Sequence, residues 1–305
     1  MEKISPDTIS QRRIVSYFEH EFGEMSLASA FEHVEEMKEA GFTNVILCVT
    51  ESDIDNSARQ EYLRIVKSLL DEQGIEVWAD PWGVGSVFGG EGISHFKNSG
   101  EKSCYCNPNL DVLIKQWIET VQSLEIDTIF WDEPEMKCDD HRDDELKFIE
   151  RYTAVASELN FNNVVCLTAN RKKHDQFELV ASMPNVAEIA VDPYYPNAFE
   201  VIAEADRLAY ITEWVETVQD VAERNDKRSH VWVQNFNIPL GRESIVREHI
   251  DICRHHLADV AIWGFRGCVT VPNFASPAQV QPIEIWDYTK QILAEHREPI
   301  QAEIN

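Results

Sequence analysis

Two adjacent acids, Asp132 and Glu133, follow the apolar pair Phe130-Trp131 and precede Pro134. Like charges held close together raise the pKa of one carboxyl group, and burial at the end of an apolar strand raises the pKa of both. A carboxyl group with a raised pKa keeps its proton at neutral pH, as a general acid must. Pro134 turns the chain and restricts the approach of Glu133. This segment therefore predicts a pair of carboxyl groups, Asp132 and Glu133, that could take part in acid catalysis.

Polar and aromatic residues also follow the other apolar runs of the chain. Carboxylates and amides can hydrogen-bond to sugar hydroxyls, and flat aromatic rings can stack on the C–H faces of a sugar ring. Asp192 ends another apolar run and is the predicted second catalytic carboxyl group, with Asp132 as the other choice. Any one of these residues alone could be a helix cap or a solvated charge, so the prediction depends on their joint occurrence. The predicted substrate-binding residues are Glu19, His20, Glu51, Asp80, Trp82, Glu91, Asn170, Tyr194, Asn235, Trp263 and Arg266.

The candidate residues lie where eight short apolar runs end, and these runs alternate with amphipathic stretches. Nearly continuous apolar runs are typical of strands covered on both faces of a parallel sheet. The predicted strands are 13–18, 44–49, 75–79, 128–131, 164–167, 186–191, 230–233 and 260–263. The predicted helices are 26–40, 57–70, 109–124, 143–159, 173–182, 199–224, 242–256 and 278–296.

This alternation has no linker or break in composition, which predicts a single α/β domain over residues 1–305. Eight repeats in a chain of this length favour a (β/α)8 TIM barrel, with a doubly wound sheet as the alternative. No Gly-x-Gly-x-x-Gly follows the first strand, which is evidence against a dinucleotide-binding fold. In such a barrel the carboxyl ends of the strands form the active-site face, which is where the candidate residues would gather.

The longest predicted loop, residues 81–108, follows the third strand. Its glycine-rich part, 83–90, could let the backbone approach a ligand or form a lid that carries Glu91 over the barrel mouth. A surface connection without a functional role is the alternative interpretation.

The segment from Trp131 to Pro134 resembles the fourth-strand signature of glycoside hydrolase barrels, in which a Glu followed by Pro is the acid/base. The adjacent Asp-Glu pair is also similar to the hexosaminidase type of barrel, and together with the glycine-rich loop it resembles a set of uncharacterised bacterial hydrolase-like barrels. The resemblance implies that Glu133 donates the proton and that Asp132 orients or charge-stabilises a substrate group. The chain departs from the large retaining clan at the seventh strand, where Gln234 and Asn235 stand instead of a nucleophilic Glu. Retaining, inverting and substrate-assisted mechanisms therefore all stay open.

Two further functions would use the same face of the barrel. A dense group of hard ligands could bind a divalent cation, which would make the chain similar to metal-dependent sugar isomerase, epimerase or lyase barrels. The residues of that group are Glu19, His20, Glu51, Asp132, Glu133 and Asp192. The missing acid on the seventh strand keeps open a barrel that binds carbohydrate without cleaving it. A zinc site is a weaker alternative, and its ligands would be Cys104, Cys106, Cys138 and His141. The prediction is that the protein needs no cofactor.

The chain has 305 residues, with 27 Lys plus Arg against 54 Asp plus Glu and a formal charge of −27. Such an acidic chain repels nucleic acids and anionic lipid surfaces, so the predicted partner is a small neutral carbohydrate. A hydrophobic content of 44% is typical of a globular protein. Seven cysteines fit reduced thiols better than a disulfide framework, and no signal peptide or membrane span is recognisable, so we expect a cytoplasmic location.

Overall fold

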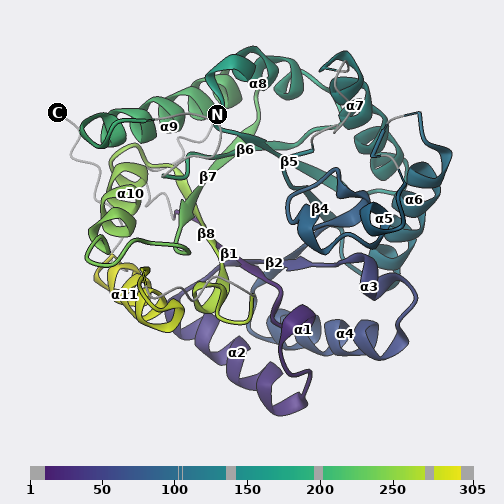
Figure 1. Ribbon diagram of the computed structural model, residues 1–305, viewed down its shortest axis with the longest axis horizontal. Helices are drawn as coiled ribbons and strands as arrows, with labels where there is room; N and C mark the ends of the chain where they lie inside the picture. The colour runs from purple at the N-terminus through teal and green to yellow at the C-terminus, as the bar shows by residue number, and fades with distance from the viewer. Residues whose placement is uncertain are drawn as a thin grey trace, which may run out of the picture.

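The computed structural model describes residues 11–101, 103–104, 106–134, 142–195, 202–271 and 278–296. Within these residues eight parallel strands close into a barrel in sequence order, because the first strand pairs with both the second and the eighth (Figure 1). The strands are β1 Arg13–Tyr17, β2 Asn44–Cys48, β3 Glu76–Asp80, β4 Thr128–Trp131, β5 Asn162–Thr168, β6 Glu188–Asp192, β7 Arg228–Gln234 and β8 Asp259–Trp263.

A ring of helices surrounds the barrel, and one longer helix follows each strand (Figure 1). These helices are α2 Leu27–Ala40, α4 Ser57–Glu72, α6 Pro108–Ser123, α7 Arg142–Glu158, α8 His174–Ala181, α9 Arg207–Arg224, α10 Ser244–His255 and α11 Pro282–Glu295. Short helices lie in the loops after β1, β2 and β3, and they are α1 Glu19–Phe22, α3 Glu51–Ile54 and α5 His95–Asn98. The predicted TIM barrel is confirmed.

Local signals in the sequence explain where several helices begin and end. Ser26 accepts the backbone N–H of Ser29 at the start of α2, and Gly41 ends that helix at a φ of +81°, which glycine adopts without strain. Two predicted helix starts were too early by four residues or more. Helix α11 begins at Pro282 rather than at 278, since proline fits the first turn, where no N–H is needed. Helix α9 begins at Arg207 rather than at 199, after a 3-10 turn over Glu204–Asp206.

The apolar side chains form two layers, as the alternation of side chains along each strand requires. On β4, Phe130 packs inside the barrel, whereas Ile129 and Trp131 pack outward against the helices. On β7, Trp232 packs inside and its neighbour Val233 packs outward. The strands are therefore buried on both faces, which is why they appear in the sequence as nearly continuous apolar runs.

A buried ionic network lies at the amino end of the barrel. Arg12 contacts Glu188 at 2.7 Å and Asp259 at 2.6 Å. Nδ1 of His230 lies 2.6 Å from the same Glu188 carboxylate, and both side chains are almost completely buried. Arg12 directly precedes β1, Glu188 begins β6, His230 lies in β7 and Asp259 begins β8, so this network ties four neighbouring strands together.

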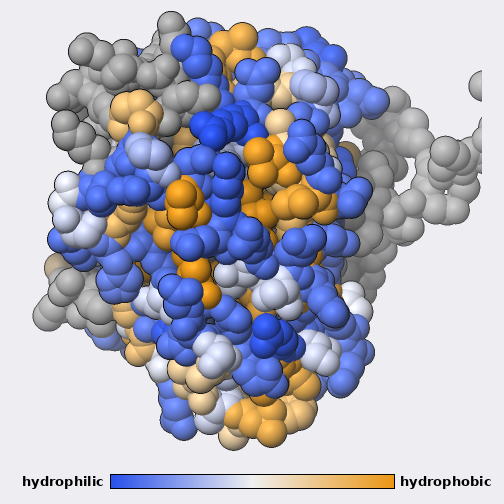
Figure 2. Space-filling model, turned by 90° about the vertical axis from the view of Figure 1, so that its right-hand side faces the viewer, coloured by the Kyte–Doolittle hydropathy of each residue, from blue (hydrophilic) through white to orange (hydrophobic). Residues whose placement is uncertain are grey.

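The outer surface on the side of α5 and α6 is mainly hydrophilic, with small hydrophobic groups between the polar residues (Figure 2). Val112 of α6 is among the exposed apolar side chains, while Trp117 of the same helix is fully buried. None of the helices among the described residues has both the length and the apolar character that a membrane span requires.

Candidate active site

Four acids gather at the carboxyl ends of the strands. Asp80 and Asp192 are the last residues of β3 and β6, and Asp132 and Glu133 directly follow β4. Asp80 is completely buried, Asp132 and Asp192 are 8% and 6% exposed, and Glu133 is half-buried. Glu133 has a φ of +42°, a left-handed conformation that costs a residue other than glycine about 1–2 kcal/mol. The surrounding structure therefore holds Glu133 in one orientation at the face where barrel enzymes carry out chemistry.

After burial, Glu133 is the neighbour that raises the pKa of Asp192 most. Two carboxyl groups close together cannot both ionise freely, so one of them keeps a proton more readily. Burial raises the pKa of Asp192 well above its usual range, and the charge and hydrogen bond of Glu133 raise it further. A backbone N–H from Ala169, 3.2 Å from the Asp192 carboxylate, opposes this effect only in part. Asp192 therefore keeps its proton to a higher pH than an ordinary aspartic acid does.

Asp132 and Asp80 extend this acidic cluster. Burial raises the pKa of Asp132 well above its usual range, as do the nearby Asp80 and Glu133. Burial raises the pKa of Asp80 as well, although a hydrogen bond from the Cys48 thiol at 3.4 Å lowers it in part. Among the described residues, no Lys, Arg or His forms an ion pair or hydrogen bond with any of the four acids. The cluster can therefore donate protons, because holding protons is the alternative to burying several uncompensated negative charges.

Aromatic side chains fill the barrel next to these acids. Trp82 stacks on Phe18 with ring centroids 5.1 Å apart, and Trp263 lies 5.8 Å from Trp82. Gly90 packs against the Trp82 indole, where a Cβ atom would come within 2.4 Å of ring atoms. Tyr194 is half-buried, with its ring edge-on to Phe236. Trp82 and Trp263 therefore form a wall of the site, and Tyr194 is the ring among the predicted platforms that is more open to a ligand.

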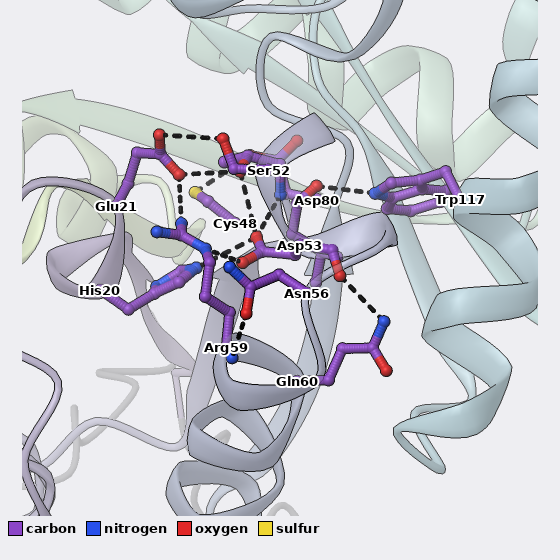
Figure 3. Close-up of polar contacts among 12 residues, drawn as sticks. His20, Glu21, Cys48, Ser52, Asp53, Asn56, Arg59, Gln60, Asp80 and Trp117 are labelled. Carbon is purple, nitrogen blue, oxygen red and sulfur yellow. Dashed lines mark hydrogen bonds and ion pairs between the residues drawn. The ribbon is translucent and has the colours of Figure 1, made fainter.

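His20 and Glu19 are not brought to the acidic cluster, in contrast to the sequence prediction. Figure 3 shows that His20 and Arg59 both point toward Asp53, at 3.2 Å and 2.6 Å. His20 is completely buried there, in a polar cluster formed by α1, α3 and α4. Glu19 accepts a hydrogen bond from Thr270 at 3.2 Å, and burial raises its pKa to about 7.

Glu51 and Arg266 have partners that keep them from the predicted role in substrate binding. Both carboxylate oxygens of Glu51 already accept hydrogen bonds from the loop after β3. Arg266 points to the outside of the barrel, where it contacts Glu36 at 2.7 Å and Glu32 at 2.5 Å on α2. Position at the end of a strand was therefore not sufficient to place either side chain in the site.

The remaining predicted residues differ in their surroundings. Asn170 accepts the backbone N–H of Lys172 and so caps a short turn. Asn235 is completely buried with neither side-chain polar atom hydrogen-bonded. Gln234, which stands where retaining glycosidases carry an acid, uses its amide to bind the backbone of Tyr195 and Phe236. The side chain of Glu91 lies outside the described part of the structure.

Metal ligands are not grouped in the described part of the chain: no three His, Cys, Asp or Glu residues there are arranged to hold an ion. The sulfur atoms of Cys104 and Cys106 lie 2.8 Å apart. Cys138 and His141, the other two ligands of the considered zinc site, lie outside the described residues.

Two participants in the site were missed by the sequence analysis. Cys48 donates its thiol hydrogen bond to Asp80, and Gly89 packs directly on the carboxylate of Asp132. The contact of Cys48 with Asp80 could have been expected, because Cys48 lies at the end of the second predicted strand and faces the same way as Ile46. The adjacent pair Gly89-Gly90 was a signal for a close backbone approach, but not for what it approaches.

Solved structures with the same fold include several glycoside hydrolases. A GH5_18 protein from Bifidobacterium longum subsp. longum has a TM-score of 0.66 at 11% identity, covering 95% of this chain and 81% of that one. A GH5_18 protein from Streptomyces cattleya in complex with GlcNAc has a TM-score of 0.65 at 13% identity, covering 96% and 82%. The endo-β-1,4-mannanase from Thermotoga petrophila has a TM-score of 0.63 at 11% identity, covering 94% and 78%. No protein-family model and no curated protein sequence matches this chain. At such low identities the similarity shows a shared barrel fold.

Proposed function

We propose that this protein is a glycoside hydrolase that cleaves a small oligosaccharide or glycoside, with Glu133 as the general acid. The observation that carries the proposal is the group of four acids, Asp80, Asp132, Glu133 and Asp192, at the carboxyl end of the barrel. A general acid for a glycosidic oxygen must be able to reach the substrate, and Glu133 is the least buried member of the cluster. The fold shared with GH5 proteins supports the same reaction class.

In this mechanism Glu133 protonates the leaving oxygen, and its partner Asp192 stabilises the carboxylate that results. Asp192 is the neighbour of Glu133 within the cluster, so it acts on Glu133 directly. Asp192 and Asp132 are the two candidates for the second carboxyl group, and their distances from Glu133 would decide between them.

The test uses the variant Glu133→Gln, which keeps the shape of the side chain but cannot donate a proton. We expect kcat on oligosaccharides to fall by about 10²–10⁴-fold, while binding of the sugar survives. Aryl glycosides with acidic phenol leaving groups need less help from an acid, so their kcat should fall less. Glu119→Gln, on the exposed face of α6, is the matched control and should be fully active. Full activity of Glu133→Gln on a confirmed glycoside would refute the assignment.

The same assays separate two other functions. Gln234, with both ends of its amide bound to backbone groups, favours a barrel that binds carbohydrate without cleaving it. That function would give measurable binding but no product across a broad panel of glycans. A divalent-metal isomerase or epimerase would instead lose its activity on treatment with EDTA and contain a stoichiometric ion.

A further inference from the structure

The loop after β3 shields Asp132 from water. The backbone N–H of Gly89 donates to the carbonyl oxygen of Asp132 at 3.1 Å. Gly89 also packs so closely that a Cβ atom would lie 2.0 Å from Oδ2 of Asp132. The next residue, Gly90, adopts a φ of +76° against the indole of Trp82. Only glycines can bring the chain this close, so the burial of Asp132 depends on where this loop lies.

The carboxylate of Glu51 binds that loop through four hydrogen bonds. Oε1 of Glu51 accepts the N–H of Gly85 at 2.7 Å and the hydroxyl of Ser94 at 2.8 Å. Oε2 accepts the backbone N–H groups of His95 and Phe96 at 2.7 Å and 2.9 Å. These four donors come from both sides of the Gly89-Gly90 segment. Glu51 is itself held in place as the first residue of α3, which Thr50 caps.

We propose that Glu51 is a positioning residue: its carboxylate fixes the loop after β3 where Gly89 shields Asp132 from water. The consequence for catalysis rests on the proposed glycosidase function. Burial is the largest cause of the raised pKa of Asp132, so a loosened loop would let water reach this carboxyl group and lower its pKa toward the usual range. The acidic cluster would then lose a proton at lower pH.

The test compares Glu51→Gln with Gly89→Ala. A glutamine keeps one acceptor oxygen and no charge, and hydrogen bonds to charged groups are the stronger ones. In Glu51→Gln we expect hydrogen exchange at the amides of Gly85, His95 and Phe96 to become about 10- to 100-fold faster. The basic limb of the kcat profile should move to lower pH, with kcat falling more than KM rises.

Gly89→Ala leaves the bonds of Glu51 intact but forces the loop away from Asp132. It should produce the same movement of the pH profile without faster exchange at His95 and Phe96. The control Glu61→Gln, on an exposed face of α4, should change none of these readouts. If Glu51→Gln does not fold, as judged by circular dichroism, Ser94→Ala removes one of the four donors and carries the same measurements.

Unchanged exchange in Glu51→Gln overturns the inference, and so does faster exchange with an unmoved pH profile. The outcome for the proposed function is separate. If the wild-type chain cleaves no glycoside, the proposed function fails, and carbon-13 NMR titration of the Asp132 carboxyl group in the same variants still decides whether Glu51 controls its exposure. A titration midpoint that stays in place in Glu51→Gln and Gly89→Ala would then overturn the inference.

Discussion

Replacing Glu188 by Gln tests whether the amino end of the barrel serves stability alone. Burial by itself would raise the pKa of Glu188, but hydrogen bonds with His230 and Arg12 outweigh it and lower the pKa from 4.5 to about 2. At 1.36 kcal/mol per pKa unit, this difference corresponds to about 3 kcal/mol of stability at neutral pH. The Gln variant loses this energy, while Arg12 keeps its ion pair with Asp259, so we expect a loss of about 3 kcal/mol at pH 7.

The pH dependence gives this prediction its sharpest check. Because the pKa of Glu188 is lowered by folding, its contribution is complete above about pH 4.5 and is lost as the pH falls toward 2. Urea unfolding of wild type and Glu188→Gln at pH 7, 4 and 3 should therefore show a difference that shrinks with falling pH. Glu178→Gln breaks an exposed pair with Arg224 and should cause little change at any pH. An equal effect of the two variants, a difference independent of pH, or a changed kcat in a folded Glu188→Gln would refute the reasoning.

Two further predictions concern the carboxyl end. Burial raises the pKa of Glu19 to about 7, so its ionisation destabilises the folded state as the pH rises from about 4.5 through 7. Glu19→Gln should raise the free energy of unfolding by up to about 3 kcal/mol at pH 8 and leave it unchanged at pH 4, as measured by urea titration. Gly90→Ala places a Cβ against the indole of Trp82 at a positive φ, so we expect at least 1–2 kcal/mol of destabilisation. Unchanged unfolding and tryptophan fluorescence in Gly90→Ala would contradict the packing described.

The barrel could be predicted from the sequence because the apolar runs of the strands and the start and end signals of the helices indicated the same alternation of elements. Strand β4 is a short apolar run between polar residues, and α2 has a capping Ser26 and a terminal Gly41 at the expected distance. The start of α11 was predicted too early although Pro282, a typical first-turn residue, marks it. The loop after β3 was predicted without regular structure, but it contains the short helix α5, which Ser94 caps and Glu51 anchors from 44 residues away. A contact of that range leaves no local trace in the sequence.

The residues that reach the site could be predicted from their place on the strands, but the directions of their side chains could not. The position of a residue at the end of a barrel strand determines which edge it reaches, and this placed Asp80, Asp132 and Asp192 together. The direction of a side chain beyond the strand depends on partners elsewhere in the chain. Arg266 is drawn to α2 by Glu32, 234 residues away. The sequence alone could not distinguish such a structural ion pair from a residue that faces a ligand.

Strand β6 carries both kinds of buried acid, four residues apart. Glu188 and Asp192 lie on the same face of the strand as Ala190, which packs inside the barrel. At the amino end His230 and Arg12 form hydrogen bonds with Glu188 and lower its pKa, so Glu188 stays ionised. At the carboxyl end Asp192 meets Glu133 and Asp132 instead, and its pKa is raised. The net charge of −27 therefore does not show which acids can donate protons. The neighbours of each buried carboxyl group decide this, because they determine whether its pKa is lowered or raised.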